Sequence, residues 1–173
     1  MILPLSYVFA DLSVSGVFVR DGFYKVSFNG SFSVSDITLK TAGSETEIVF
    51  PSYKDKNQVA VLKREHKKRF AKDIKENKVS GPVPATAVKF KINKFSPVKN
   101  LKQTLAFASV IFEDVLEVEC RILSGRNGLW VAWPAANKNG VWKKQFEFID
   151  KSLKREVEGK LLERYENEKS KGK

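Results

Sequence analysis

The chain has 173 residues, enough for one domain or two small ones, and an ordinary hydrophobic fraction of 42%. A single cysteine, Cys120, excludes an internal disulfide and favours a reducing compartment. No segment approaches the roughly 20 apolar residues of a membrane span, and the N-terminus has no basic, apolar leader, so we expect a cytoplasmic protein without a membrane partner.

The net charge of +11 is concentrated in one quarter of the chain. Residues 62–102 hold 13 Lys and Arg against 3 Asp and Glu, a net charge of +10, whereas residues 1–61 carry −1 and residues 103–173 carry +2. A localised basic surface is typical of a nucleic-acid-binding protein. The alternative is a solvated helix face that only keeps the protein soluble.

The first half begins with alternating strands joined by tight turns. Asp21-Gly22 and Asn29-Gly30 both separate alternating segments, a strong hairpin signal. A helix is expected from about Gln58 to Asn77, with an apolar stripe at Leu62, His66, Phe70 and Ile74. We expect His66 to be a hydrogen-bonded core residue rather than a ligand.

Two prolines and a glycine in residues 80–86 end this helix and predict a linker. Strands are expected around Val88–Ile92, from Leu105, over Val115–Leu123 and over Leu129–Trp133, with an extended connection at Trp142–Phe148. A second helix is expected from about Asp150 to Glu168, followed by a frayed tail at 169–173.

An internal repeat relates the two halves. Ser35–Pro51 aligns without gaps with Val118–Pro134, and each copy reads as an alternating strand, a polar turn, a second alternating strand and a proline, followed by a helix. Such a unit does not bury its apolar face alone. We therefore predict an α+β fold of two units, each with about four antiparallel strands and a C-terminal helix, packed as an intramolecular pseudo-dimer. The predicted boundaries are 1–79 for the first unit, 80–86 for the linker and 87–168 for the second unit.

The second half resembles the stage V sporulation protein G (SpoVG) family of small bacterial nucleic-acid-binding regulators. The resemblance rests on Asn127–Pro134, on Asn139-Gly140 and on the following helix up to Tyr165, and covers roughly residues 88–166. It implies a four-stranded sheet plus helix that pairs with a second copy, here supplied by the first half. The family usually has a Lys-Arg pair just after the proline, whereas this chain has Ala135-Ala136-Asn137-Lys138.

The predicted function is nucleic-acid binding of a prokaryotic or phage type, directed at the phosphate backbone, with low sequence specificity and single strands preferred. The ligand is single-stranded DNA or RNA, with duplex DNA left open. Two alternatives stay open: a SpoVG-like DNA- or RNA-binding regulator with a site preference, and a basic module that docks an acidic protein. The chain is expected to be a monomer with an internal pseudo-dimer, and further self-association is left open. The predicted phosphate-binding residues are Lys63, Arg64, Lys67, Lys68, Lys72, Lys75, Lys89, Lys91, Lys138, Lys143 and Lys144.

Exposed aromatic rings beside lysines are the candidates for base stacking. Trp142, next to Lys143 and Lys144, is the best of them, ahead of Trp130 and of Tyr24 with its neighbour Phe23. Trp133 shares its strand face with Leu129 and Val131, and we expect it in the core.

Catalysis and cofactors are not expected. The chain has no glycine-rich phosphate loop and no Cys/His pair within plausible reach in sequence, and one His with one Cys offers no metal site. Glu117 and Glu119 share a strand face, and we interpret them as surface charge on an ordinary strand rather than as an acid–base pair.

Overall fold

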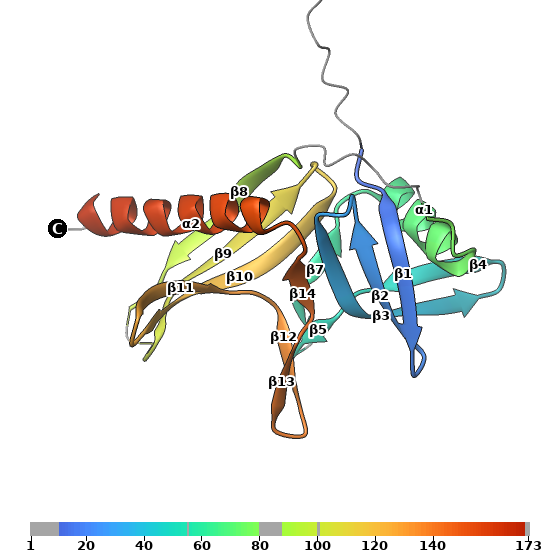
Figure 1. Ribbon diagram of the computed structural model, residues 1–173, viewed down its shortest axis with the longest axis horizontal. Coiled ribbons are helices and arrows are strands. Elements are labelled where there is room, and N and C mark those ends of the chain that lie inside the picture. Colours follow the sequence, from blue (N-terminus) through green and yellow to red (C-terminus); the bar gives the residue numbers. More distant parts are fainter. Residues whose placement is uncertain (1–10, 55, 80–87, 100, 172–173) are drawn as a thin grey trace, which may run out of the picture.

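The computed structural model describes residues 11–54, 56–79, 88–99 and 101–171. Its body consists of two antiparallel five-stranded sheets, each covered by one helix (Figure 1). The predicted linker at 80–86 lies outside the described residues, as do residues 6–10 of a strand-like run expected over residues 6–15. The strand-rich composition with two helices agrees with an α+β fold.

The first sheet has the order β1-β2-β3-β14, with β4 also pairing with β3. Its strands are β1 (Val14–Arg20), β2 (Phe23–Phe28), β3 (Phe32–Ala42), β4 (Glu45–Val49) and β14 (Phe146–Phe148). The hairpin predicted at Asp21-Gly22 joins β1 to β2, and Asn29-Gly30 joins β2 to β3. All four turn residues have positive φ, which Asp, Asn and Gly tolerate best.

The second sheet has the order β11-β10-β9-β8, with β7 also pairing with β10. Its strands are β7 (Val59–Val61), β8 (Phe90–Pro97), β9 (Thr104–Phe112), β10 (Leu116–Gly125) and β11 (Gly128–Ala132). The four strands predicted for the second half are therefore present, with shifted ends. Strand β7 was not predicted.

Each half of the chain contributes one strand to the other half's sheet. Strand β14 pairs with β3, where Phe148 lies opposite Phe32, and β7 pairs with β10, where Val61 lies opposite Leu116. The flanking backbone follows the same scheme. Ser35 N–H donates to the Gln145 carbonyl at 2.8 Å, and Glu119 N–H donates to the Gln58 carbonyl at 2.9 Å.

A small hairpin follows the proline in each half. Strands β5 (Ser52–Tyr53) and β6 (Lys56–Asn57) form the first hairpin, and β12 (Ala135–Lys138) and β13 (Val141–Lys144) form the second. The second hairpin is longer and projects from the body at the bottom of Figure 1. The sequence predicted only an extended connection in this region.

The first helix is shorter than predicted. Helix α1 spans Arg64–Lys75, because Val59–Val61 pairs with β10 instead of entering the helix. The residues before α1 include two β-branched valines, which favour a strand, and the strand that they pair with belongs to the other half of the chain. The predicted helix start at Gln58 was therefore wrong.

Helix α2 spans Lys151–Lys171 and so continues past the predicted end at Glu168. At its N-terminus the Asp150 carboxylate accepts hydrogen bonds from the backbone N–H groups of Ser152 and Leu153, at 2.7 and 3.2 Å. Ion pairs Lys169–Glu166 and Lys171–Glu168 lie along the last turns. These contacts support helix where we expected a frayed tail from residue 169.

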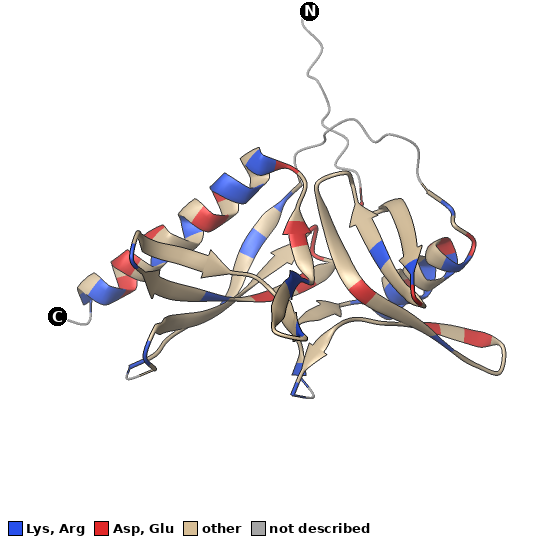
Figure 2. Ribbon diagram, turned by 60° about the horizontal axis from the view of Figure 1, so that its bottom comes forward, with Lys and Arg blue, Asp and Glu red and all other residues tan. Residues whose placement is uncertain are grey.

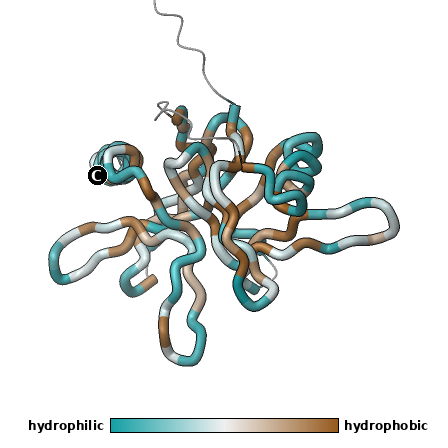
Figure 3. The backbone as a smooth tube through the Cα atoms, turned by 45° about the vertical axis from the view of Figure 1, so that its right-hand side comes forward, coloured by the Kyte–Doolittle hydropathy of each residue, from teal (hydrophilic) through white to brown (hydrophobic). Residues whose placement is uncertain are grey.

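The core is continuous between the two sheets and rich in aromatic rings. Phe32 contacts Phe112 and Phe146 with ring centroids 4.8 and 5.4 Å apart, so residues from β3, β9 and β14 meet at one place. Phe70 from α1 packs on Phe28 at 5.2 Å. Figure 3 shows hydrophobic positions concentrated in the central strands, with the outlying loops mostly hydrophilic. The two halves thus share one core rather than having one each.

Candidate nucleic-acid interface

The basic side chains of α1 line a shallow groove of about 520 Å³ between this helix and β4. The positive side of the groove consists of Arg64, Lys67, Lys68, Lys72 and Lys75. These positions recur every three to four residues, so they lie along one face of the helix. The opposite side is formed by the β3–β4 turn and β4, including Glu45, Thr46 and Glu47.

Two of the five cations have a partner in the groove. Lys68 Nζ lies 2.9 Å from Glu45 Oε1, and Lys75 Nζ lies 3.5 Å from the Thr46 hydroxyl. The hydrogen bond from Lys68 lowers the pKa of Glu45, which is consistent with a positive potential in the groove. Within the part of the chain that the structure describes, Arg64, Lys67 and Lys72 make no ion pair. Positive charge therefore remains available for a ligand.

The basic residues before α1 and in β8 meet at the β9–β10 turn. Lys91 forms an ion pair with Asp114 there, and its hydrogen bond is the main cause of the lowered pKa of that carboxyl. Lys63 and Lys89 lie close enough to lower the same pKa further. The structure thus brings together lysines from both sides of the predicted linker, which the sequence alone did not place in contact.

Lys138, Lys143 and Lys144 lie on the β12–β13 hairpin, which stands apart from α1 (Figures 1 and 2). Lys138 pairs with Asp36 at 2.7 Å, and Lys144 pairs with Glu147 at 3.3 Å. The eleven predicted phosphate-binding residues therefore fall into three groups rather than one surface: the α1 groove, the surroundings of Asp114 and the hairpin.

The candidate stacking residues differ in exposure. Trp142 is 66% exposed on β13, and Trp130 is 50% exposed on β11, where its indole lies beside Gly125. Tyr24 is partly buried and packs against the core. Trp133, which we expected in the core, is partly buried and packs against it: it contacts Phe146 and Phe148, and its Nε1–H donates to Glu158 Oε1 at 2.8 Å.

Among the described residues, Phe18, Tyr53 and Phe107 are also exposed but were not predicted to stack on bases, and Phe23 was named only as the neighbour of Tyr24. Phe18 is 63% exposed, Phe23 is 45% exposed and Tyr53 is 57% exposed. Lys138 Nζ lies 5.1 Å from the centroid of the Phe23 ring, and Lys54 Nζ lies 5.5 Å from that of Tyr53. The alternation in β1 and β2 was a signal for Phe18 and Phe23, whereas Tyr53 is in a two-residue strand with no period to read.

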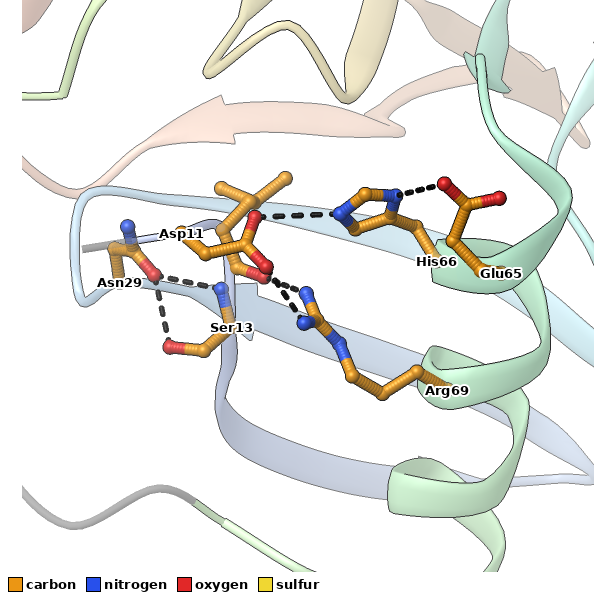
Figure 4. Close-up of polar contacts among 7 residues, drawn as sticks. Asp11, Ser13, Asn29, Glu65, His66 and Arg69 are labelled. Carbon is orange, nitrogen blue, oxygen red and sulfur yellow. Dashed lines mark hydrogen bonds and ion pairs between the residues drawn. The ribbon is translucent and has the colours of Figure 1, made fainter. Parts of the chain in front are cut away.

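His66 belongs to a structural cluster on the inner side of α1 (Figure 4). Its Nε2 lies 3.3 Å from Asp11 Oδ1, and Arg69 Nη1 donates to Asp11 Oδ2 at 2.6 Å. Arg69 also donates to the Leu12 carbonyl at 2.6 Å. Partial burial alone would raise the pKa of Asp11, but hydrogen bonds and charge from Arg69 and His66 lower it. These contacts attach the start of β1 to α1 and indicate a structural role.

Glu117 is held more firmly than the solvent-facing side chain we expected. Its Oε1 accepts hydrogen bonds from the Ser109 hydroxyl at 2.7 Å and from Asn93 Nδ2 at 3.0 Å, and it lies 3.2 Å from Lys94 Nζ. Burial alone would raise its pKa, yet these partners lower it. Glu117 therefore ties β8, β9 and β10 together as a carboxylate. Among the described residues, no cluster of three or more His, Cys, Asp or Glu side chains has the arrangement of a metal site.

Comparison with known proteins assigns a family to the second half of the chain. Residues 86–167 match the model of the SpoVG family, which confirms the resemblance drawn from the strand and proline at Asn127–Pro134. The matched region includes β8 to β14 and most of α2. No curated protein and no solved structure matches the chain. None of the described helices is both long and apolar enough to cross a membrane.

Proposed function

We propose that this protein binds nucleic acid through the phosphate backbone, with low sequence specificity and a preference for single strands. The observation that carries the proposal is the groove between α1 and β4, where Arg64, Lys67 and Lys72 make no ion pair among the described residues. The match of residues 86–167 to the SpoVG family supports a regulatory role of this kind.

The chemistry of the groove fits a polyanion better than a small ligand. Its basic side consists of flexible lysines with one arginine, and these long side chains present charge without a rigid constellation of hydrogen-bond donors. Such cations neutralise phosphates and release counterions, which gives affinity without reading the sequence. Low sequence specificity therefore follows from the type of contact.

We further infer that the two halves are repeats packed as an intramolecular pseudo-dimer, with units at 1–79 and 87–168. The alignment of Ser35–Pro51 with Val118–Pro134 carries over to the strand pairs residue by residue. Leu39 lies opposite Ile48 in the first half, and the residues aligned with them, Ile122 and Val131, lie opposite each other in the second.

The hydrogen bonds of the loops support the same relation. Ser13 N–H donates to Asn29 Oδ1 at 2.8 Å, and at the corresponding place Lys89 N–H donates to Glu113 Oε1 at 2.6 Å. The exchanged strands β7 and β14 stand in equivalent positions of the two sheets. In this interpretation the first half supplies the partner that a SpoVG-type unit requires.

The test is fluorescence anisotropy of the full chain with labelled single-stranded DNA, single-stranded RNA and duplex DNA of equal length, each over a salt series. We expect binding that weakens steeply as salt rises, with single strands bound more tightly than duplex. Ligands that bind equally tightly would contradict the single-strand preference. Flat curves for all three at low salt would overturn the proposal and favour an acidic protein as the partner.

A further inference from the structure

The β12–β13 hairpin carries the most exposed large hydrophobic side chain of the described residues. Trp142 is 66% exposed, and its neighbour Val141 is 59% exposed. An exposed indole on a projecting element loses the free energy that burial would supply, about 25 cal/mol for each Å² of apolar surface. Its position therefore needs an explanation other than packing.

Strand pairing divides the hairpin into two faces. Trp142 lies opposite Asn137, and two residues along, Lys144 lies opposite Ala135, so these four residues share one face. Lys138 lies opposite Val141 and Ala136 lies opposite Lys143, so the other face carries the remaining two lysines. Of the two lysines that follow Trp142, only Lys144 is on the same face as the indole.

Asp36 in β3 holds the face that carries Lys138 and Lys143 against the body of the protein. Lys138 Nζ lies 2.7 Å from Asp36 Oδ1, and Gln145 Nε2 donates to Asp36 Oδ2 at 3.0 Å. Lys138 is beside the Asn139-Gly140 turn and Gln145 follows β13, so a single carboxylate holds both ends of the hairpin. Asp36 has a side chain only 20% exposed and a φ of 59°, so the backbone of β3 turns here to present it.

This clamp orients the hairpin from one face, while on the other face Trp142 stays exposed and Lys144 pairs with Glu147 of β14. A base-stacking ring works best when it is held in place before the strand arrives, because less conformational entropy is lost on binding. Lys144, on the same face as the ring, supplies positive charge for a phosphate beside a stacked base. Duplex DNA keeps its bases stacked on one another, so only an unpaired base gains from the indole.

We propose that Trp142 is a base-stacking residue for single-stranded nucleic acid and that Asp36 is the positioning residue that holds its hairpin. The inference rests on the proposed function and adds to it a second contact site, distinct from the α1 groove. The groove supplies affinity for any strand, and the hairpin makes the protein discriminate in favour of single strands.

The test compares Trp142→Ala and Trp142→Phe with Phe107→Ala, an exposed aromatic residue (44%) in the middle of the second sheet. In anisotropy titrations with matched single strands and duplex, W142A is expected to weaken single-strand binding by about 5- to 150-fold, the range that one base stack contributes. Duplex binding should stay the same, W142F should retain part of the single-strand affinity, and F107A should match wild type. An equal loss for both ligands, or no loss for single strands, overturns the stacking role.

A double-mutant cycle tests Asp36. Asp36→Asn should weaken single-strand binding in the wild-type background and have no further effect in the W142A background, because both changes act through the same ring. An equal loss in both backgrounds overturns the positioning role. Failure of the proposed function gives a separate result, since wild type would then bind neither ligand at low salt.

Discussion

Helices α1 and α2 each cover one sheet, but they differ in how their charged side chains are paired. Along α2, lysines pair with glutamates three or four positions away, as in Lys154–Glu158 and Lys160–Glu156, and Figure 2 shows blue and red alternating along this helix. Among the described residues of α1 there is no such pair between positions three or four apart, and its lysines face a groove. The charges of α2 neutralise one another along the helix, whereas the cations of α1 line the groove. The position of a helix in a fold therefore does not decide its function.

The two post-proline hairpins show the same divergence. The β5–β6 hairpin has two-residue strands and exposes Tyr53, whereas β12–β13 has four-residue strands, exposes Trp142 and is clamped by Asp36. The basic helix is thus in one half and the clamped aromatic hairpin in the other. The two halves of the chain therefore differ in the surfaces that they expose.

The largest effect is expected from breaking the shared core. Phe146 is 1% exposed in β14 and contacts Phe32, Phe112 and Trp133, so Phe146→Ala should lower the free energy of unfolding by about 3–5 kcal/mol. Because β14 completes the sheet of the other half, chemical denaturation followed by both fluorescence and far-UV circular dichroism should still give one transition.

Phe18→Ala is the control for this experiment, because Phe18 is 63% exposed and should change stability by less than about 0.5 kcal/mol. Separate transitions for the two probes would show that the halves unfold independently and would contradict the shared core.

The next largest effect is expected on nucleic-acid affinity, when charges are reversed on α1 rather than on α2. Reversing two charges in the groove, K67E with K72E, should weaken binding to all strands and reduce the slope of log affinity against log salt by about 2. The same change of net charge on α2, K151E with R155E, should have a smaller effect on both quantities. Equal losses from the two double variants would mean that overall charge, and not the α1 groove, governs binding.

A smaller effect is expected on the free energy of unfolding when low pH protonates Asp36 and breaks its contacts with the hairpin. Burial alone would raise the pKa of Asp36, but hydrogen bonds from Lys138 and Gln145 lower it below the ordinary 3.8. A depressed pKa in the folded protein means that the stabilisation is present above pH 3.8 and is lost as pH falls through the folded pKa.

Asp36→Asn is the suitable variant, because asparagine tolerates the positive φ at this position. Wild type should exceed D36N in unfolding free energy by about 1–2 kcal/mol at pH 7, and the two should converge as the pH falls below 3.8. A gap that persists in acid would show that the ion pair is not its cause.

The smallest difference is expected between the rates at which a buried cysteine reacts in the two sheets. Burial beneath α2 raises the pKa of Cys120 to about 12, so its thiol should react with a disulfide reagent at pH 8 roughly a thousandfold more slowly than a free cysteine. Ile37 in β3 is likewise buried in the first sheet. A cysteine placed there in a C120A background should react at a similar rate if both sheets open together. A much faster reaction would identify the first sheet as the less stable one.

Local patterns predicted the elements that local interactions determine. The Asp21-Gly22 hairpin, the core position of Trp133 and the four strands of the second half followed from alternation and turn chemistry. The start of α1 did not, because β7 depends on a partner in the other half. The clamp at Asp36 joins β3 in the first half to the hairpin in the second, and no periodicity carries such information. Contacts between the two halves, such as the clamp at Asp36, were therefore visible only in the structure.

The exchange of strands also sets an order of events during synthesis. The edge of β3 at Phe32–Val34 pairs with β14, which is synthesised after the whole first half and after strands β8 to β11. Until then the first half has an open edge and apolar residues without their partners, the features that promote aggregation of nascent chains. We expect soluble yield to depend on translation rate, since the long-range pairing of β14 with β3 is slow.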